Sequence, residues 1–220
     1  PGSVGLFLQG AEGDVNSCVV HKPETESLLA LDVIAGRYAR AVRQGIADAR
    51  TVRDGTVRGI RREVVFTRKS WDRAFLEAKQ KEFADIVTRH ATVPSYAEHR
   101  HEANINSVYL CGIRKMLARL DAGLPLGRPF EIAGLRLGPI GILGSPFETF
   151  QAIKNETLQG IRAPVPFVAS FVNDTVGYAP DHTAAARGGY AADMVPFITG
   201  EAPFLDAHSE LVAAHRETDR

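Results

Sequence analysis

The sequence has 220 residues, 45% of them hydrophobic, which is enough to bury one sizeable core. Its 26 basic and 26 acidic residues cancel to a formal net charge of zero, so no overall charge favours nucleic acid or an anionic membrane as a partner. No apolar run approaches the roughly 20 residues that cross a bilayer, and we expect no transmembrane segment. These features predict one soluble globular domain.

The first third of the chain predicts a strand, a loop and a long helix. Residues 4–8 form a short apolar run typical of a buried strand. Because this strand starts so close to Pro1, we expect either a processed or cut chain or a sequence whose earlier part is absent. A loop with two glycines follows at 9–17. Over 24–49, apolar residues recur at three- and four-residue steps, which predicts an amphipathic helix with its stripe in the core. The stripe comprises Leu28, Leu31, Ile34, Tyr38, Val42 and Ile46.

The middle third predicts a strand followed by two helices. Residues 57–67 are rich in β-branched side chains and indicate the strand. Ser70 is a suitable N-cap for the first helix. Residues 90–103 have almost no apolar periodicity and indicate a polar connection. The second helix is predicted over 104–121, with Gly123 as a natural stop.

The last third alternates strands and helices, with a turn predicted at Gly134. Together with the preceding elements, this alternation predicts an α/β fold of mixed β-sheet layers flanked by helices. The predicted segments are strands at 130–132, 135–143 and 165–172, and helices at 149–160 and 205–215.

Three places gather catalytic residue types directly after predicted strands. They are the loop 10–17, the turn Pro146-Phe147-Glu148 and the stretch 173–178. Loops that leave neighbouring strands at the same end of a sheet converge. We therefore expect these side chains, although distant in sequence, to share one cleft.

In this order, the three segments resemble the neutral (alkaline, non-lysosomal) ceramidases and their bacterial relatives. Gly13-Asp14-Val15 is similar to the family's glycine-aspartate-valine loop, and Pro146-Phe147-Glu148 to its proline-glycine-glutamate turn. Asn173 and Tyr178 match its Asn-x-x-x-x-Tyr segment, and Tyr190 matches its second tyrosine. Each motif alone is short, and the order and spacing carry the resemblance.

The resemblance covers about residues 4–200 and implies that 1–220 is the C-terminal portion of a single neutral ceramidase-like catalytic domain. It implies a zinc site with Glu148 and Tyr178 as two of four ligands. The other two would be histidines from the N-terminal half of the same domain or from a cleaved partner chain. The implied function is a zinc-dependent amidohydrolase that uses metal-activated water to hydrolyse the N-acyl amide bond of a lipid or another small molecule.

The resemblance also implies roles for residues around the metal. Tyr190 would donate a hydrogen bond to the developing oxyanion during catalysis. Asp14 and Ser17 would shape the substrate pocket. His182, which closely follows the Asn-x-x-x-x-Tyr segment, is a candidate for the rim of the same pocket.

Two positions depart from the family pattern. Asn16 stands where the ceramidases have serine; a carboxamide orients substrate or water at a catalytic position but is no nucleophile. Phe147 replaces a glycine, and we expect it to narrow the space around Glu148. These departures motivate two alternatives, a catalytically inactive ceramidase-like binding or scaffold protein and a zinc hydrolase of another acyl bond.

Each site residue also has a structural interpretation. Glu148 is suited to the first turn of the following helix, where an acid is favoured by the helix dipole. Tyr178 and Tyr190 could lie at the edge of the core, and Asp14 could belong to a turn. The histidines and carboxylates of 98–102 form a further cluster, which is more typical of a solvated surface than of a metal site.

Overall fold

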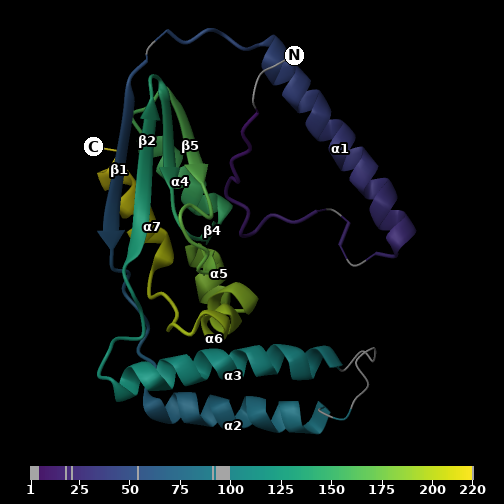
Figure 1. Ribbon diagram of the computed structural model, residues 1–220, viewed down its shortest axis with the longest axis vertical. Coiled ribbons are helices and arrows are strands. Elements are labelled where there is room, and N and C mark those ends of the chain that lie inside the picture. Colours follow the sequence, from purple (N-terminus) through teal and green to yellow (C-terminus); the bar gives the residue numbers. More distant parts are fainter. Residues whose placement is uncertain are drawn as a thin grey trace.

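A four-stranded β-sheet with helices packed on one face is the centre of the fold (Figure 1). The computed structural model describes residues 5–17, 19–20, 22–53, 55–90, 92 and 100–219. The mixed α/β class predicted from the sequence is confirmed. In chain order the elements are α1 (Glu24–Ala47), β1 (Val57–Val64), α2 (Arg73–His90), α3 (Arg100–Asp121), β2 (Phe130–Leu137), β3 (Ile140–Gly144), β4 (Glu148–Thr149), α4 (Gln151–Gly160), β5 (Val165–Ala169), β6 (Tyr178–Ala179), α5 (His182–Arg187), η1 (Tyr190–Met194), α6 (Val195–Thr199) and α7 (Ala207–Thr218).

The main sheet has the order β1-β2-β3-β5, and the short strands β4 and β6 form a separate pair. β2 is antiparallel to both of its neighbours, whereas β3 and β5 are parallel and are joined through β4 and α4. The turn predicted at Gly134 is wrong, because β2 runs straight through that residue. The chain turns at Gly138 instead, which has a left-handed φ of 54°.

One face of the sheet carries the main core. Phe130 and Ile132 of β2 pack against Leu211 and Val212 of α7, and Ile153 of α4 joins the same cluster. The spacing of these apolar residues explains the packing, since alternate strand positions share a face and helical positions one turn apart share another. The helix predicted at 205–215 is therefore confirmed as α7, a largely buried element.

The other face of the sheet is largely uncovered among the described residues. Four apolar side chains on this face are 37–47% exposed: Leu135 and Leu137 of β2, and Val165 and Phe167 of β5. Val57, at the start of β1, is 71% exposed. Apolar surface of this extent on neighbouring strands is typical of a face that another layer covers.

A second core forms where α2 and α3 pair and α6 packs on them, at the base of the molecule in Figure 1. Phe83 of α2 lies edge-on to Phe197 of α6, with ring centroids 5.2 Å apart. Asp72 caps α2, because its Oδ1 accepts a hydrogen bond from the Phe75 N–H at 2.8 Å. The prediction of Ser70 as the cap is therefore wrong by two positions.

The N-terminal region departs most from the expectations. The helix predicted at 24–49 is confirmed as α1, but none of its residues is buried. It lies apart from the sheet in Figure 1, and Leu28, Leu31 and Ile46 are each more than half exposed. Residues 5–8 form no strand and are exposed, because no described strand lies beside them to complete a ladder. Position 4 lies outside the described residues.

The close approach of α3 to α6 gives a test of the fold. A Cβ added to Gly112 would lie 1.7 Å from the carbonyl oxygen of Phe197. We expect Gly112→Ala to reduce the free energy of unfolding by about 3 kcal/mol, because the backbones must separate. Gly36→Ala in α1 is the matched control, since nothing lies within 4 Å of its Cβ. Urea denaturation should show no loss for the control, and an equally stable Gly112→Ala protein would contradict this packing.

Candidate active site

The pairing of two short strands brings the first two predicted site residues together. β4 and β6 are parallel, with Glu148 in register with Tyr178. The Glu148 N–H donates to the carbonyl oxygen of Gly177 at 2.9 Å, and the Val176 N–H donates to that of Pro146 at 3.0 Å. Glu148 therefore lies in a strand and not in the first turn of α4, which begins only at Gln151.

Tyr178 and Glu148 interact through their side chains. Burial raises the pKa of the Tyr178 hydroxyl to about 12, and the hydrogen bond to Glu148 and the negative charge of that carboxylate act in the same direction. The neutral phenol is therefore strongly favoured when no cation is near. A metal ion beside the two oxygens would reverse this preference, because a cation stabilises the phenolate.

Tyr190 joins this pair from a different element. Its ring lies edge-on to that of Tyr178, with centroids 6.1 Å apart. It begins the π-helical turn η1, a kind of turn that is frequent at functional sites. The Asp193 carboxylate anchors the turn by accepting a hydrogen bond from the Gly189 N–H at 2.7 Å. Gly189 has a φ of 107°, a conformation that other residues rarely adopt.

The three side chains face one hollow of about 570 Å³. Its rim includes the cationic residues Lys115 and Arg128. Arg128 is already paired with Asp174 at 2.7 Å and with Glu201 at 3.2 Å. Val176, Val195 and Ile198 supply apolar wall. The hollow thus combines a carboxylate, two phenols and an apolar surface, as a site for an amphiphilic ligand does.

The loop 9–17 contacts the segment that carries Glu148 but does not line the hollow. The Gly13 N–H donates to the carbonyl oxygen of Thr149 at 3.1 Å, and a side chain at Gly13 would collide with the carbonyl oxygen of Glu148. The Asp14 carboxylate accepts from the Gln151 N–H at 2.8 Å and so caps α4. Asp14 is thus placed beside the site as a capping residue.

Three other predicted site residues lie elsewhere. Asn16 and Ser17 are exposed and do not line the hollow, and the Ser17 hydroxyl donates to the carbonyl oxygen of Val19. His182 lines a separate pocket, where its Nε2 lies 3.0 Å from Asp206 and its ring stacks on His208. The structure does not bring these three together with Glu148.

Phe147 does not narrow the hollow, and that prediction is wrong. Its side chain is fully buried and packs edge-on against Phe66, Phe130 and Phe204, with centroids 5.1–5.4 Å away. Strand alternation sends the Phe147 ring into the core and the Glu148 carboxylate to the opposite side. Phenylalanine in place of glycine therefore anchors the turn.

Glu12 is a candidate residue that the sequence reasoning did not find. Both of its carboxylate oxygens are buried and have no hydrogen-bond partner of normal geometry among the described residues. Burial raises its pKa, and the charge of Glu148 adds to this effect, while the nearby Ser170 and Gln9 oppose it. No sequence pattern distinguishes this glutamate from a solvated loop residue. An unpaired buried carboxylate beside Glu148 indicates that the site is suited to a proton or a cation.

Glu148 and Tyr178 offer oxygen donors of kinds that zinc accepts, but the described residues place no imidazole beside them. No described histidine lines the hollow. His215, for example, is buried in the core, where burial lowers its pKa to about 4. Within the described ranges, no three His, Cys, Asp or Glu side chains are grouped as metal ligands. Residues 98 and 99 of the cluster 98–102 lie outside those ranges.

Comparison with known proteins yields no match to a protein-family model, to a curated protein or to a solved structure. Among the described residues, no helix is both long and apolar enough to cross a membrane. The geometry around Glu148 is therefore the main evidence on function.

The interaction of Tyr178 with Glu148 predicts a measurable titration. In metal-free protein, we expect the phenolate absorbance of Tyr178 to develop only near pH 12, and Glu148→Gln to lower that pKa by removing the negative charge. The Tyr178 signal is the difference between wild type and Tyr178→Phe in a spectrophotometric titration. Glu217→Gln, which changes an exposed carboxylate paired with Arg62, is the control and should leave the pKa unchanged. An unshifted titration in Glu148→Gln would show that the two side chains do not interact.

Proposed function

We propose that this chain is the C-terminal portion of a neutral ceramidase-like zinc amidohydrolase that hydrolyses an N-acyl amide bond. One observation carries the proposal: Glu148, Tyr178 and Tyr190, selected from separate short motifs, line the same hollow. They come from two strands and a π-helical turn, and their adjacency does not follow from their sequence positions.

Glu148 and Tyr178 are the two protein ligands that this chain contributes. Carboxylate oxygen is a usual ligand of zinc, and the phenol of Tyr178 lies near enough to that carboxylate for Glu148 to raise its pKa. When bound, zinc would polarise the amide carbonyl and activate water. Because the pKa of Tyr178 is raised, its ligation requires loss of a proton that the metal-free site holds firmly. Metal affinity should therefore increase with pH.

Tyr190 and the hollow would orient the substrate. Tyr190 is 54% exposed, so its ring is accessible from the hollow. A hydroxyl there is suited to donate a hydrogen bond to the carbonyl oxygen of a bound amide as negative charge develops. The apolar residues Val176, Val195 and Ile198 would contact the acyl chain.

Two further ligands would come from another polypeptide segment, either the N-terminal half of the same domain or a cleaved partner chain. Two features support such a segment. One is the apolar sheet face that carries Leu135 and Phe167, and the other is the exposed stripe of α1. Both are surfaces that a second layer would cover. The segment would bring two histidines to the hollow that Glu148 lines.

Asn16 favours a second candidate, a protein that binds zinc and a ligand without turnover. The family's serine is replaced, and Asn16 is exposed away from the hollow. Zinc bound in the intact protein without hydrolysis of any N-acyl amide would support this candidate. Hydrolysis of an ester alone would indicate a zinc hydrolase of another acyl bond.

The zinc site predicts a specific loss of metal. We expect the intact protein to bind about one zinc per site, and Glu148→Gln to lose most of it because a ligand is removed. Elemental analysis after dialysis measures the content, with Glu217→Gln as the control that keeps its zinc. Wild-type protein that binds no zinc, or Glu148→Gln protein that binds as much as wild type, would contradict the proposal.

The role of Tyr190 predicts a loss of rate without a loss of metal. Tyr190→Phe keeps the ring and deletes the donor, so kcat on an N-acyl amide should fall by roughly 10²-fold while zinc content stays constant. Glu217→Gln, which changes an exposed carboxylate on α7 away from the hollow, is the control and should be fully active. Unchanged turnover of Tyr190→Phe would remove this residue from the mechanism.

A further inference from the structure

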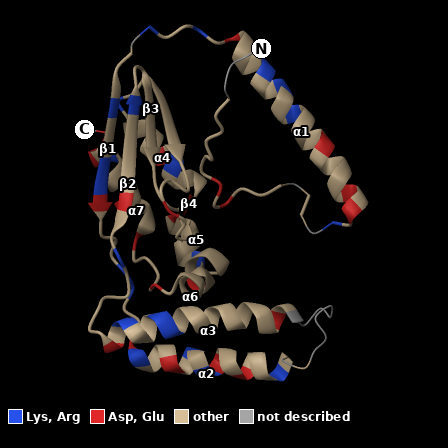
Figure 2. Cartoon of the chain, in the orientation of Figure 1, with Lys and Arg blue, Asp and Glu red and all other residues tan. Residues whose placement is uncertain are grey.

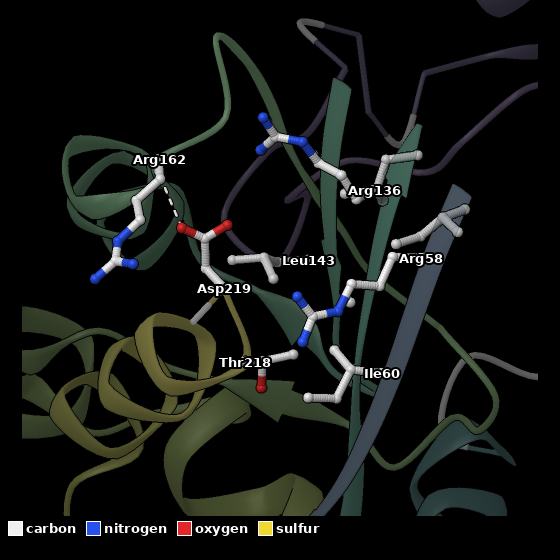
Figure 3. A pocket seen from close by; sticks show the side chains of 11 residues that line it. Arg58, Ile60, Arg136, Leu143, Arg162, Thr218 and Asp219 are labelled. Carbon is white, nitrogen blue, oxygen red and sulfur yellow. Dashed lines mark hydrogen bonds between the residues drawn. The ribbon is translucent and has the colours of Figure 1, made fainter. Parts of the chain in front are cut away.

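A second cavity, of about 250 Å³, lies at the end of the main sheet and shares no lining residue with the hollow at Glu148. Figure 3 shows that Arg58 and Arg136 enter it from the strands, while Thr218 and Asp219 lie on the side of α7. Basic positions on β1 and β2 lie side by side at the same end of the sheet in Figure 2. The cavity thus has a cationic wall built on regular secondary structure.

The two arginines are direct cross-strand partners. β1 and β2 are antiparallel, and Arg58 is in register with Arg136. Residues in register on neighbouring strands project from the same face, and like charges placed there destabilise a sheet. This face is the one that α7 covers further along, where Phe130 and Ile132 are buried. The two cations at the open end of this face would therefore be stabilised by a bound anion.

The residues that the structure describes do not supply that anion to either guanidinium. The other arginines of β1 are paired, Arg61 with Glu131 at 3.8 Å and Arg62 with Glu217 at 2.9 Å. For Arg58 and Arg136, no carboxylate among the described residues lies within the 4.0 Å of an ion pair.

Two hydrogen bonds with backbone groups restrain the side chains of Asp219 and Arg136. Asp219, the acid that lines the cavity, is held by the Arg162 N–H, which donates to its Oδ2 at 2.7 Å. The Nε of Arg136 donates to the carbonyl oxygen of Gly138 at 2.6 Å, which restrains the guanidinium near the cavity. A preformed cationic group loses little conformational entropy when an anion binds.

The base of the cavity is apolar. Ile60, Leu143 and two glycines, Gly134 and Gly141, line the cavity beside the arginines. A Cβ on Gly134 would lie 2.9 Å from the Ile60 side chain, and one on Gly141 would lie 2.5 Å from Ala163. The absence of side chains at these positions keeps the helix end and the sheet close together. A bound molecule would meet charge at one end and hydrocarbon at the other.

We propose that this cavity binds a small organic anion, a carboxylate or a phosphate monoester with a short apolar tail. Its oxygens would lie between the guanidinium groups of Arg58 and Arg136, which are suited to planar or tetrahedral oxyanions. Its tail would lie on Ile60 and Leu143. The proposal is independent of the zinc site, because it rests on different residues.

Calorimetric titration of the full chain with hexanoate, hexyl phosphate, inorganic phosphate and hexanol tests the proposal. We expect at least one of the two amphiphilic anions to bind, and the tighter one identifies the headgroup. Hexanol should bind more than tenfold more weakly, since it has no charge. Affinity should fall as salt is added, because the contact is ionic. If neither amphiphilic anion binds, the site does not exist; if inorganic phosphate binds as tightly as hexyl phosphate, the apolar base has no role.

Two variants with opposite expected effects locate the binding. Arg58→Gln should weaken the affinity at least tenfold, and Asp219→Asn should strengthen it severalfold by removing a competing negative charge while keeping an acceptor for the Arg162 N–H. Arg61→Gln is the matched control, because Arg61 is on the same strand but faces the other side. All three positions are at least partly exposed, and circular dichroism verifies folding. Equal affinity for Arg58→Gln and wild type would overturn the proposal.

Discussion

The parallel pairing of β4 with β6 is the contact on which the candidate active site depends. It is only two residues long on each strand, so its few hydrogen bonds cannot hold it alone. The buried ring of Phe147 supplies the missing stability, because it anchors the turn before β4 in a cluster of aromatic side chains. With Phe147 inward, strand alternation directs Glu148 outward to Tyr178. Hydrophobic packing on one side of the strand therefore positions the chemistry on the other.

The loop 9–17 adds a second constraint on the same segment. Gly13 lies against the backbone of Glu148 and Thr149, and Asp14 caps the helix that follows. Glu12, between Ala11 and Gly13, is consequently carried into a buried position where its carboxylate is unpaired. Burial raises the pKa of Glu12, and the charge of Glu148 acts in the same direction. Buried titratable groups with a shifted pKa are typical of functional sites.

Uncovered apolar surface is the other general feature of the chain. The stripe of α1 and the open face of the main sheet are amphipathic in sequence, yet neither is buried among the described residues. Both have the pattern of a core layer. The arginine-lined cavity differs from these surfaces, because its cations lie at the end of a face that α7 already covers. The first two surfaces are suited to another polypeptide, and the cavity to a small anion.

The predictions for single elements succeeded where a local pattern is sufficient. Helical periodicity located α1, α3, α4 and α7, and β-branched runs located β1 and β5. The predicted ends of elements were wrong where several nearby residues could serve as the cap or the turn, as at Ser70 and Gly134. Gly134 is a glycine because Thr218 and Ile60 approach it closely, and a long-range contact of this kind leaves no local signal.

The sequence by itself determined the α/β class, the long helices and the short motifs that contain Glu148, Tyr178 and Tyr190. Periodicity and turn chemistry act between neighbours in the chain, and the motifs are short enough to be read directly. Only the tertiary structure decided which of the named residues share a hollow, that Phe147 points away from it, and that His182 belongs to another pocket. It also revealed Glu12 and the Arg58 and Arg136 pair. These results depend on strand register and on packing between distant segments, and a one-residue change of register would reverse which side chains face the core.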